Sequence, residues 1–207
     1  MKTLKQSLFL VAGLLSLYSC KNDDDNQNPT TAVDTSVNFQ FKNTINIGGE
    51  GSAEISAYDP LSKKLFTVNT EMDQISIYNI SDIDAPIMET PIDVSAFGAP
   101  NSVAVNNGKL AIAVEASNKQ AAGKIYVYNT SDNSLANQYT VGSLPDMVTF
   151  TKDGNFILSA NEGEPNDDYT VDPDGTVSII DVANNNVTTL DFSAFNSQEA
   201  TLESQGF

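Results

Sequence analysis

Three segments of the chain repeat one strand pattern at intervals of about 50 residues. They are Asp73–Ile80 (DQISIYNI), Gly123–Thr130 (GKIYVYNT) and Gly175–Val182 (GTVSIIDV). Each follows two other apolar strand patterns and precedes a fourth, and turn residues such as Asn107-Gly108, which suit tight hairpins, lie between them. A repeat of this length with four antiparallel strands is typical of a β-propeller blade. We therefore predict an all-β fold, a β-propeller.

The repeat divides the domain 41–207 into three predicted blades, at about residues 48–98, 99–144 and 145–195. A propeller needs roughly four to eight blades to close, so we expect these blades to be part of a larger ring. The alternative is a β-sandwich with coincidental spacing, which does not predict the recurring Ile/Val-Tyr-Asn strand. One helix is predicted, Asn196–Ser204, with Asn196 as its N-cap.

The N-terminus has the layout of a secretory signal peptide over residues 1–19. Lys2 and Lys5 precede an apolar run, Leu8–Leu17, which is far shorter than the roughly 20 residues that span a bilayer. The single cysteine of the chain, Cys20, follows at the cleavage position. This junction resembles a bacterial lipobox, which implies a lipid on Cys20. The alternative is an ordinary signal peptide with an incidental cysteine.

Residues 20–40 are polar and acidic and offer almost nothing to bury, which predicts a flexible tether. Lys21 followed by Asp23, Asp24 and Asp25 resembles the surface-export signal of Bacteroidetes lipoproteins. That resemblance implies an outer-membrane lipoprotein that faces the outside of the cell. A tether that is merely solvated is the alternative.

Composition narrows the chemistry of the folded part. The chain has 10 Lys and Arg against 27 Asp and Glu, a formal net charge of −17. That charge repels phosphate backbones, so we expect no nucleic acid partner. There is no histidine, which excludes a Ser-His-Asp or Cys-His system and any His-ligated metal within this chain. Any catalysis here would rest on carboxylates and a metal ion.

An acidic insertion in the third predicted blade is the leading candidate site. Its carboxylates are Glu162, Glu164, Asp167, Asp168, Asp172 and Asp174. Oxygen ligands without His or Cys favour a hard cation, calcium before magnesium. The alternative is a solvated loop in which Asp172–Gly175 forms a hairpin turn.

Three further patterns concern the strand ends of the blades and the packing between blades. The second blade has a milder insertion at the equivalent place, Ala116–Ala122, and both insertions are expected to shape one surface. The second strands end in polar residues, Asn69–Glu71, Glu115 and Asn161–Glu162, which would form a ring around the channel mouth or satisfy turns. The near-repeat of Asp93–Phe97 in Asp191–Phe195 predicts that Phe97 and Phe195 pack between blades.

Several of these segments resemble known families. Lys64–Asn69 (KLFTVN) resembles the strand of YVTN-type propeller repeats. Ala99–Val105 and Asn161–Pro165, which leads to Tyr169 and Asp172–Gly175, are similar to the choice-of-anchor I family of exported bacterial proteins. The resemblance covers roughly residues 48–207 and implies an exported propeller. Some members of that family are labelled alkaline-phosphatase-like.

Two functions follow as hypotheses. The first is a binding or adhesion module without catalysis, which holds a protein or glycan ligand at the cell surface. The second is a calcium-dependent phosphoester hydrolase, alkaline-phosphatase-like or phytase-like, in which carboxylates position the ion. No catalytic residue can be named for either, and fold alone does not choose between them.

Overall fold

The structure, a computed structural model, describes residues 40–50 and 52–206. The chain forms two units, Met1–Gln40 and Phe41–Phe207. The predicted signal peptide, Cys20 and all of the predicted tether but its last residue lie outside the described residues. Among the residues that are described, no helix is long and apolar enough to cross a membrane.

Three antiparallel sheets make up the second unit, and each contains consecutive strands of the chain. Sheet 1 contains β1 (Ser56–Asp59), β2 (Lys64–Asn69), β3 (Gln74–Asn79), β4 (Ile87–Met88) and β5 (Ile92–Asp93). Sheet 2 contains β6 (Pro100–Asn106), β7 (Lys109–Val114), β8 (Ala122–Asn129) and β9 (Leu135–Ser143). Sheet 3 contains β10 (Pro145–Phe150), β11 (Phe156–Asn161), β12 (Thr176–Asp181) and β13 (Asn186–Leu190). In sheet 1 the outer strand is split, because β4 and β5 each pair with a different part of β3.

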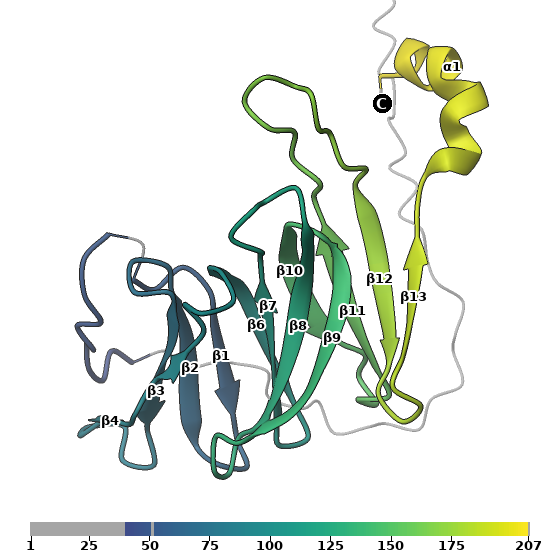
Figure 1. Cartoon of the computed structure of the whole chain (residues 1–207). Helices are drawn as coiled ribbons and strands as arrows, with labels where there is room; N and C mark the ends of the chain where they lie inside the picture. Colours follow the sequence, from purple (N-terminus) through teal and green to yellow (C-terminus); the bar gives the residue numbers. More distant parts are fainter. Residues whose placement is uncertain (1–39, 51, 207) are drawn as a thin grey trace, which may run out of the picture. The chain divides into compact units, whose positions relative to one another are not determined.

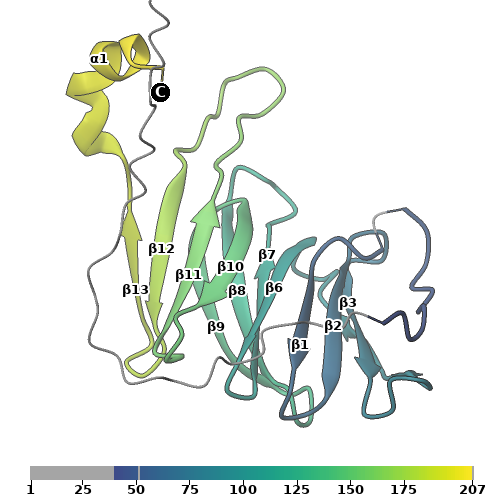
Figure 2. The same ribbon diagram turned by 180° about the vertical axis from the view of Figure 1, so that it is seen from behind.

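The sheets pack face to face in chain order (Figures 1 and 2). Side chains alternate across sheet 2 with the period of two of a β-strand. Leu110 and Ile112 pack in a core shared with sheet 1, whereas Ala111 and Ala113 pack in a core shared with sheet 3. The first strand of each sheet lies beside the first strand of the next. This is the packing of β-propeller blades, so the predicted all-β propeller fold is confirmed.

Tight turns join the strands where the sequence predicts them. Asn107 and Gly108 have φ angles of 47° and 74°, the left-handed backbone that a two-residue hairpin of the favoured type requires. Lys109 then pairs back with Asn106. The hairpin register, which depends on this turn, sets which side chains of β7 face sheet 1 and which face sheet 3.

The C-terminal helix differs from its prediction. It consists of a 3₁₀ segment, η1 (Ser193–Gln198), followed by α1 (Glu199–Ser204), and Asn196 lies inside η1 instead of capping a helix. The reason is an earlier turn, in which a carboxylate oxygen of Asp191 accepts hydrogen bonds from the backbone N–H and the hydroxyl of Ser193. The ring centre of Phe97 lies 4.7 Å from that of Tyr126 in sheet 2, but Phe97 is 44% exposed, so its packing between the blades is partial. Phe195 is half exposed.

Candidate functional site

The two insertions lie next to each other at the edge where the second strands of sheets 2 and 3 end (Figures 1 and 2). Residues 115–121 form the β7–β8 loop, and residues 162–175 form the β11–β12 loop. A hydrogen bond joins them, from Gln120 Nε2 to the backbone oxygen of Glu164, at 3.2 Å. The expectation that both insertions shape one surface is confirmed.

A shallow depression of about 440 Å³ lies between these loops. It is lined by Ser117, Asn118, Lys119, Gln120, Glu164, Pro165, Asn166 and Asp167. Amide, hydroxyl, ammonium and carboxylate groups thus line a hollow that is open to solvent. Such a surface can make many hydrogen bonds to a polar ligand. We refer to the two loops and this depression as the loop surface.

The β11–β12 loop is anchored at its base by backbone contacts to the end of sheet 2. The backbone N–H groups of Glu162 and Gly163 donate to the carbonyls of Leu144 and Ser143, at 2.9 and 3.3 Å. Gly163 has a φ of 69°, and a Cβ atom there would lie 2.4 Å from the backbone oxygen of Pro173. Only glycine fits where the two arms of the loop approach this closely.

The tip of the same loop is held by a turn of its own. Asn166 closes it in two ways, since its side-chain oxygen and its backbone N–H both bond to the backbone of Val171, at 2.9 Å each. Hydrogen bonds from Thr170 lower the pKa of Asp168 below its ordinary value. Tyr169 has a φ of 57° and is 78% exposed. An ordered turn therefore presents an aromatic ring to solvent.

The six candidate metal ligands do not converge. Glu162, Glu164, Asp167, Asp168, Asp172 and Asp174 are all exposed. Over residues 40–50 and 52–206, no group of three or more His, Cys, Asp or Glu side chains is placed to hold a metal ion. Asp168 uses its carboxylate within the turn, as described above. Calcium binding at this loop stays a prediction, and the geometry is that of solvated carboxylates.

The polar residues that end the second strands serve local structure. The side-chain oxygen of Asn69 accepts a bond from the backbone of Met72 at 3.1 Å. Glu71 accepts bonds from the Gly49 backbone and the Ser52 hydroxyl, and Glu115 accepts one from Asn101 at 3.3 Å. These contacts support the alternative in which the strand-end residues satisfy turns.

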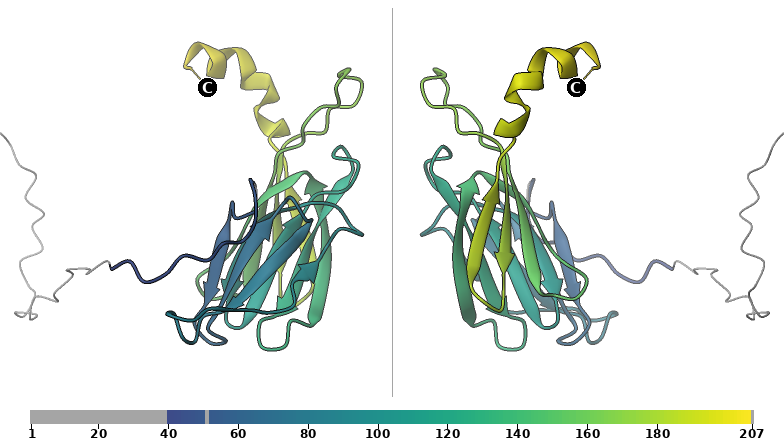
Figure 3. Two further views of the ribbon diagram at one scale, coloured as in Figure 1. Left: turned by 90° about the vertical axis from the view of Figure 1, so that its left-hand side faces the viewer. Right: turned by 90° about the vertical axis from the view of Figure 1, so that its right-hand side faces the viewer.

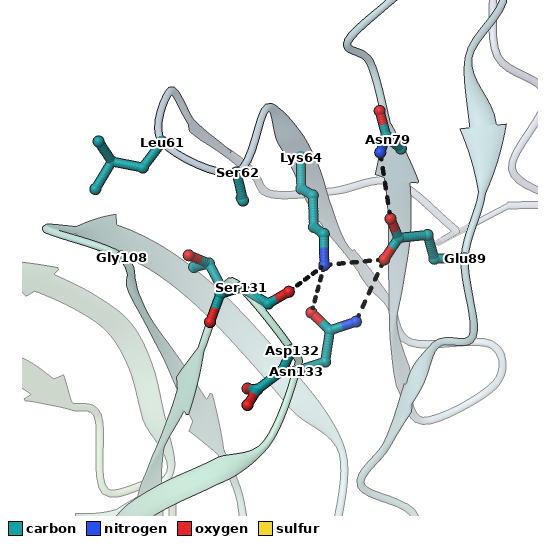
Figure 4. A pocket seen from close by; sticks show the side chains of 10 residues that line it. Leu61, Ser62, Lys64, Asn79, Glu89, Gly108, Ser131, Asp132 and Asn133 are labelled. Carbon is teal, nitrogen blue, oxygen red and sulfur yellow. Dashed lines mark hydrogen bonds and ion pairs between the residues drawn. The ribbon is translucent and has the colours of Figure 1, made fainter.

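A second depression, of about 700 Å³, lies between sheets 1 and 2 at the opposite edge, and the sequence alone does not predict it. Figure 4 shows the Lys64 ammonium at its centre. Lys64 Nζ lies 3.0 Å from Glu89 Oε2, 3.2 Å from Asn133 Oδ1 and 3.5 Å from the Ser131 backbone oxygen. All three ammonium donors are thus engaged. The ion pair joins β2 to the residue after β4, both in sheet 1, and the bonds to Asn133 and Ser131 connect it to the β8–β9 loop of sheet 2. One feature of the sequence indicates that Lys64 is buried. Side chains alternate along a strand, so Lys64 lies on the same face of β2 as the buried Phe66 and Val68.

Burial and bonding act in opposite directions on the carboxylates of this interface. Burial alone would raise the pKa of Glu89, but the hydrogen bond and charge of Lys64 bring it below the ordinary value. The same balance holds for Asp59. Burial would raise its pKa, but the hydrogen bonds from Thr130 and Ser62 bring the pKa below its ordinary value. Both carboxylates are therefore charged at neutral pH.

The strand topology and the packed sheets define a β-propeller module. The sequence matches the choice-of-anchor I domain family over residues 54–207, and the chain belongs to this family. Membership fits a surface-associated protein. No curated protein matches the sequence significantly.

Solved structures share the fold at low sequence identity. A protein from Lactobacillus plantarum matches with a TM-score of 0.50 and 17% identity, over 67% of this chain and 41% of that one. A eukaryotic initiation factor matches with a TM-score of 0.50 and 16% identity, over 74% of this chain and 35% of the other. The chain thus spans well under half the length of these two structures. The likeness shows the fold alone.

Proposed function

We propose that the chain is a binding module at the cell surface and that the loop surface contacts the ligand. The observation that carries this proposal is the bond between Gln120 and Glu164, which holds two insertions from successive blades around one polar depression. Insertions on a rigid scaffold are where binding residues concentrate. The ordered tip with the exposed Tyr169 adds a rigid aromatic contact.

The chemistry of the loop surface suits a glycan or a polar protein segment. The amides of Asn118 and Gln120 can donate and accept hydrogen bonds, and the ammonium of Lys119 is half exposed. The Tyr169 ring offers an apolar face on which a sugar or an aliphatic side chain can lie. No large apolar pocket is needed for such a ligand.

Binding to a glycan array and to immobilised extracellular-matrix proteins tests the proposal. We expect at least one probe to bind, and Tyr169→Ala combined with Gln120→Ala to weaken that binding at least about tenfold. Ser131→Ala is the matched control, since Ser131 lies at the opposite edge and engages Lys64 through its backbone oxygen. Equal binding by all three proteins, or no binding to any probe, would reject the loop surface as the ligand site.

We also propose that the module is attached to the outer membrane through a lipid on Cys20 and is exposed to the outside. The support is the lipobox-like junction and the acidic tether of the sequence, together with the family assignment. Cys20→Ala should release the protein from the membrane fraction and block processing after residue 19. Unchanged attachment and processing would exclude the lipid anchor.

The rival function is the calcium-dependent phosphoester hydrolase. The test is hydrolysis of 4-nitrophenyl phosphate by the purified protein with calcium and with chelator. We expect no turnover above the buffer rate. Robust calcium-dependent turnover would replace the binding proposal with the hydrolase.

A further inference from the structure

A small pocket, which we call the Lys124 pocket, lies where the β7–β8 loop meets the linker between sheets 1 and 2. The β7–β8 loop lies at the same edge of the sheets as the β11–β12 loop (Figure 3). The pocket has a volume of about 200 Å³, below the roughly 300–1,000 Å³ of sites that enclose a whole small-molecule ligand. It can therefore hold one chemical unit of a larger ligand. Its lining includes Phe97, Lys124 and four small residues, Ala96, Ala116, Ala122 and Gly123.

The ammonium of Lys124 has no partner in the protein. Among the described residues, three lysines are buried or half-buried, namely Lys64, Lys109 and Lys124. Lys64 has three acceptors, as described above, and Lys109 donates to the side-chain oxygen of Asn129. The Lys124 ammonium makes no hydrogen bond and no ion pair within the part of the chain that the structure describes. Its three N–H donors are thus left for solvent or a ligand.

Strand β8 determines where this ammonium lies. Side chains alternate along a strand, so Lys124 lies on the same face as Tyr126 and Tyr128, which pack in the core shared with sheet 1. Nζ of Lys124 lies 5.9 Å from the ring centre of Tyr126 and 6.0 Å from that of Phe97. These are cation–π distances. The rings stabilise the charge without supplying a hydrogen-bond acceptor.

Phe97 forms an aromatic wall of the pocket. The backbone N–H groups of Phe97 and Gly98 both donate to the carbonyl of Val94, at 2.8 and 3.3 Å, which closes a tight turn. A Cβ atom at Gly98 would lie 1.8 Å from the backbone oxygen of Glu115, so this turn packs closely against the start of the β7–β8 loop. The turn therefore fixes the position of Phe97, whose ring stays half exposed.

One carboxylate, that of Glu115, also lines the pocket. Its Oε1 lies 3.8 Å from the ammonium of Lys119, and its Oε2 accepts a hydrogen bond from Asn101 at 3.3 Å. These partners offset the charge of Glu115. The charge in the pocket that lacks a partner is that of Lys124, so the pocket favours an anion.

We propose that the Lys124 pocket binds one hexuronate unit of an acidic polysaccharide. The sugar carboxylate accepts hydrogen bonds from the Lys124 ammonium, and the apolar face of the sugar ring lies against Phe97. A hexuronate carries its carboxylate on a rigid ring, so both contacts form without the ordering of a flexible stem. An acidic side chain of a protein partner brings no ring to Phe97.

The Lys124 pocket and the loop surface are separate sites. Different residues of the β7–β8 loop line the two hollows. The assignment of the Lys124 pocket therefore does not depend on the proposed function of the loop surface.

Titration of the full chain with digalacturonate, followed by saturation-transfer NMR, tests the proposal. The dimethyl ester of the same disaccharide is the matched probe, because it keeps the sugar rings and lacks the charges. We expect digalacturonate to bind, and the ester to bind at least about tenfold more weakly. Lys124→Met keeps the apolar stem and removes the ammonium, so it should weaken digalacturonate binding by about tenfold. Lys124→Arg keeps the charge and should stay within about threefold of the wild type.

Lys152→Met is the matched control variant. It removes the same charge from an exposed lysine in the turn between β10 and β11, and it should leave the affinity unchanged. Tyr169→Ala combined with Gln120→Ala should also leave it unchanged, which distinguishes this pocket from the loop surface. Equal affinity for the acid and the ester overturns the proposal, as does equal affinity of the wild type and Lys124→Met.

Two further outcomes would also overturn the proposal. The first is an absence of binding at about 10 mM digalacturonate. The second is tetraglutamate that binds more tightly than digalacturonate and loses this affinity in Lys124→Met. That result would assign the pocket to an acidic protein segment in place of a sugar.

Discussion

The two interfaces between sheets differ in the size and the polarity of the side chains that form them. Between sheets 1 and 2 the core is made of large side chains, such as Phe66, Ile77 and Tyr126. Between sheets 2 and 3 the centre of sheet 2 contributes Ala111 and Ala113, and a good part of the facing surface is polar. One repeat therefore supports two kinds of sheet contact within a single unit.

The polar contacts of the two interfaces differ in the same way. The first interface has contacts at its edge, where Lys64 donates to Asn133 at 3.2 Å and where Thr130 donates to Asp59 at 2.5 Å. The second has its polar cluster inside, around Asn161 and against Gly142. We infer that the first interface depends on buried apolar volume and the second on close approach. Removal of atoms should damage the first, and addition of atoms should damage the second.

The largest effect is expected from Phe66→Ala. Phe66 is fully buried in the first core, and truncation of a buried Phe costs about 3–5 kcal/mol of unfolding free energy through lost burial and the cavity left behind. Urea denaturation followed by circular dichroism measures it. Phe156→Ala is the matched control, since Phe156 is 38% exposed and its truncation should cost about 1–2 kcal/mol. Similar losses in the two variants would contradict the account of the first interface.

Gly142→Ala should come next, with a loss of about 1–3 kcal/mol from overpacking. The added Cβ atom would lie 2.4 Å from Thr176 Oγ1 and 2.8 Å from Asn161 Nδ2, so the polar cluster must shift. Thr140→Val on the same strand changes an exposed side chain and should stay within about 0.5 kcal/mol. A Gly142→Ala protein as stable as the control would show that the second interface can accommodate an added methyl group.

Lys64→Ala should cost a similar amount, about 1–3 kcal/mol, between the values for exposed and fully buried ion pairs. Glu89 is 27% exposed, so solvent screens part of the loss. The wild-type pKa of Glu89 lies below its ordinary value of 4.5. The stabilisation is therefore present above that ordinary value and is lost as the pH falls through the lowered pKa.

The pH dependence distinguishes the ion pair from lost packing. We expect Lys64→Ala to flatten the fall in stability at acid pH, because Glu89 loses the hydrogen bond and the charge that contribute most to lowering its pKa. Replacing both partners, Lys64→Met with Glu89→Leu, should recover part of the loss at neutral pH. If the unfolding free energy falls with the same slope at acid pH in the wild type and in Lys64→Ala, the ion pair contributes packing alone.

The repeat predicted much of this molecule because strand period and turn chemistry are local. The hairpin at Asn107-Gly108 and the neighbouring insertions follow from blade topology. The contact of Lys64 with Asn133 was not predictable, since these residues are 69 positions apart and meet only when two sheets pack. The helix start at Asn196 was wrong because Asp191 had already begun the turn. Six carboxylates in one loop suggested a shared ion, but composition does not determine where side chains point.

Calcium should have the smallest effect on either interface. A site occupied at a hundredfold excess over Kd would stabilise the fold by about 2.7 kcal/mol, and extracellular modules bind calcium at about 10⁻⁴ to 10⁻³ M. Because the loop carboxylates are exposed and do not converge, we expect millimolar calcium and chelator to give the same melting temperature. Differential scanning calorimetry measures it, with magnesium as the control for general charge screening. A rise specific to calcium that Asp172→Asn with Asp174→Asn removes would establish the metal site and show that the loop closes around the ion.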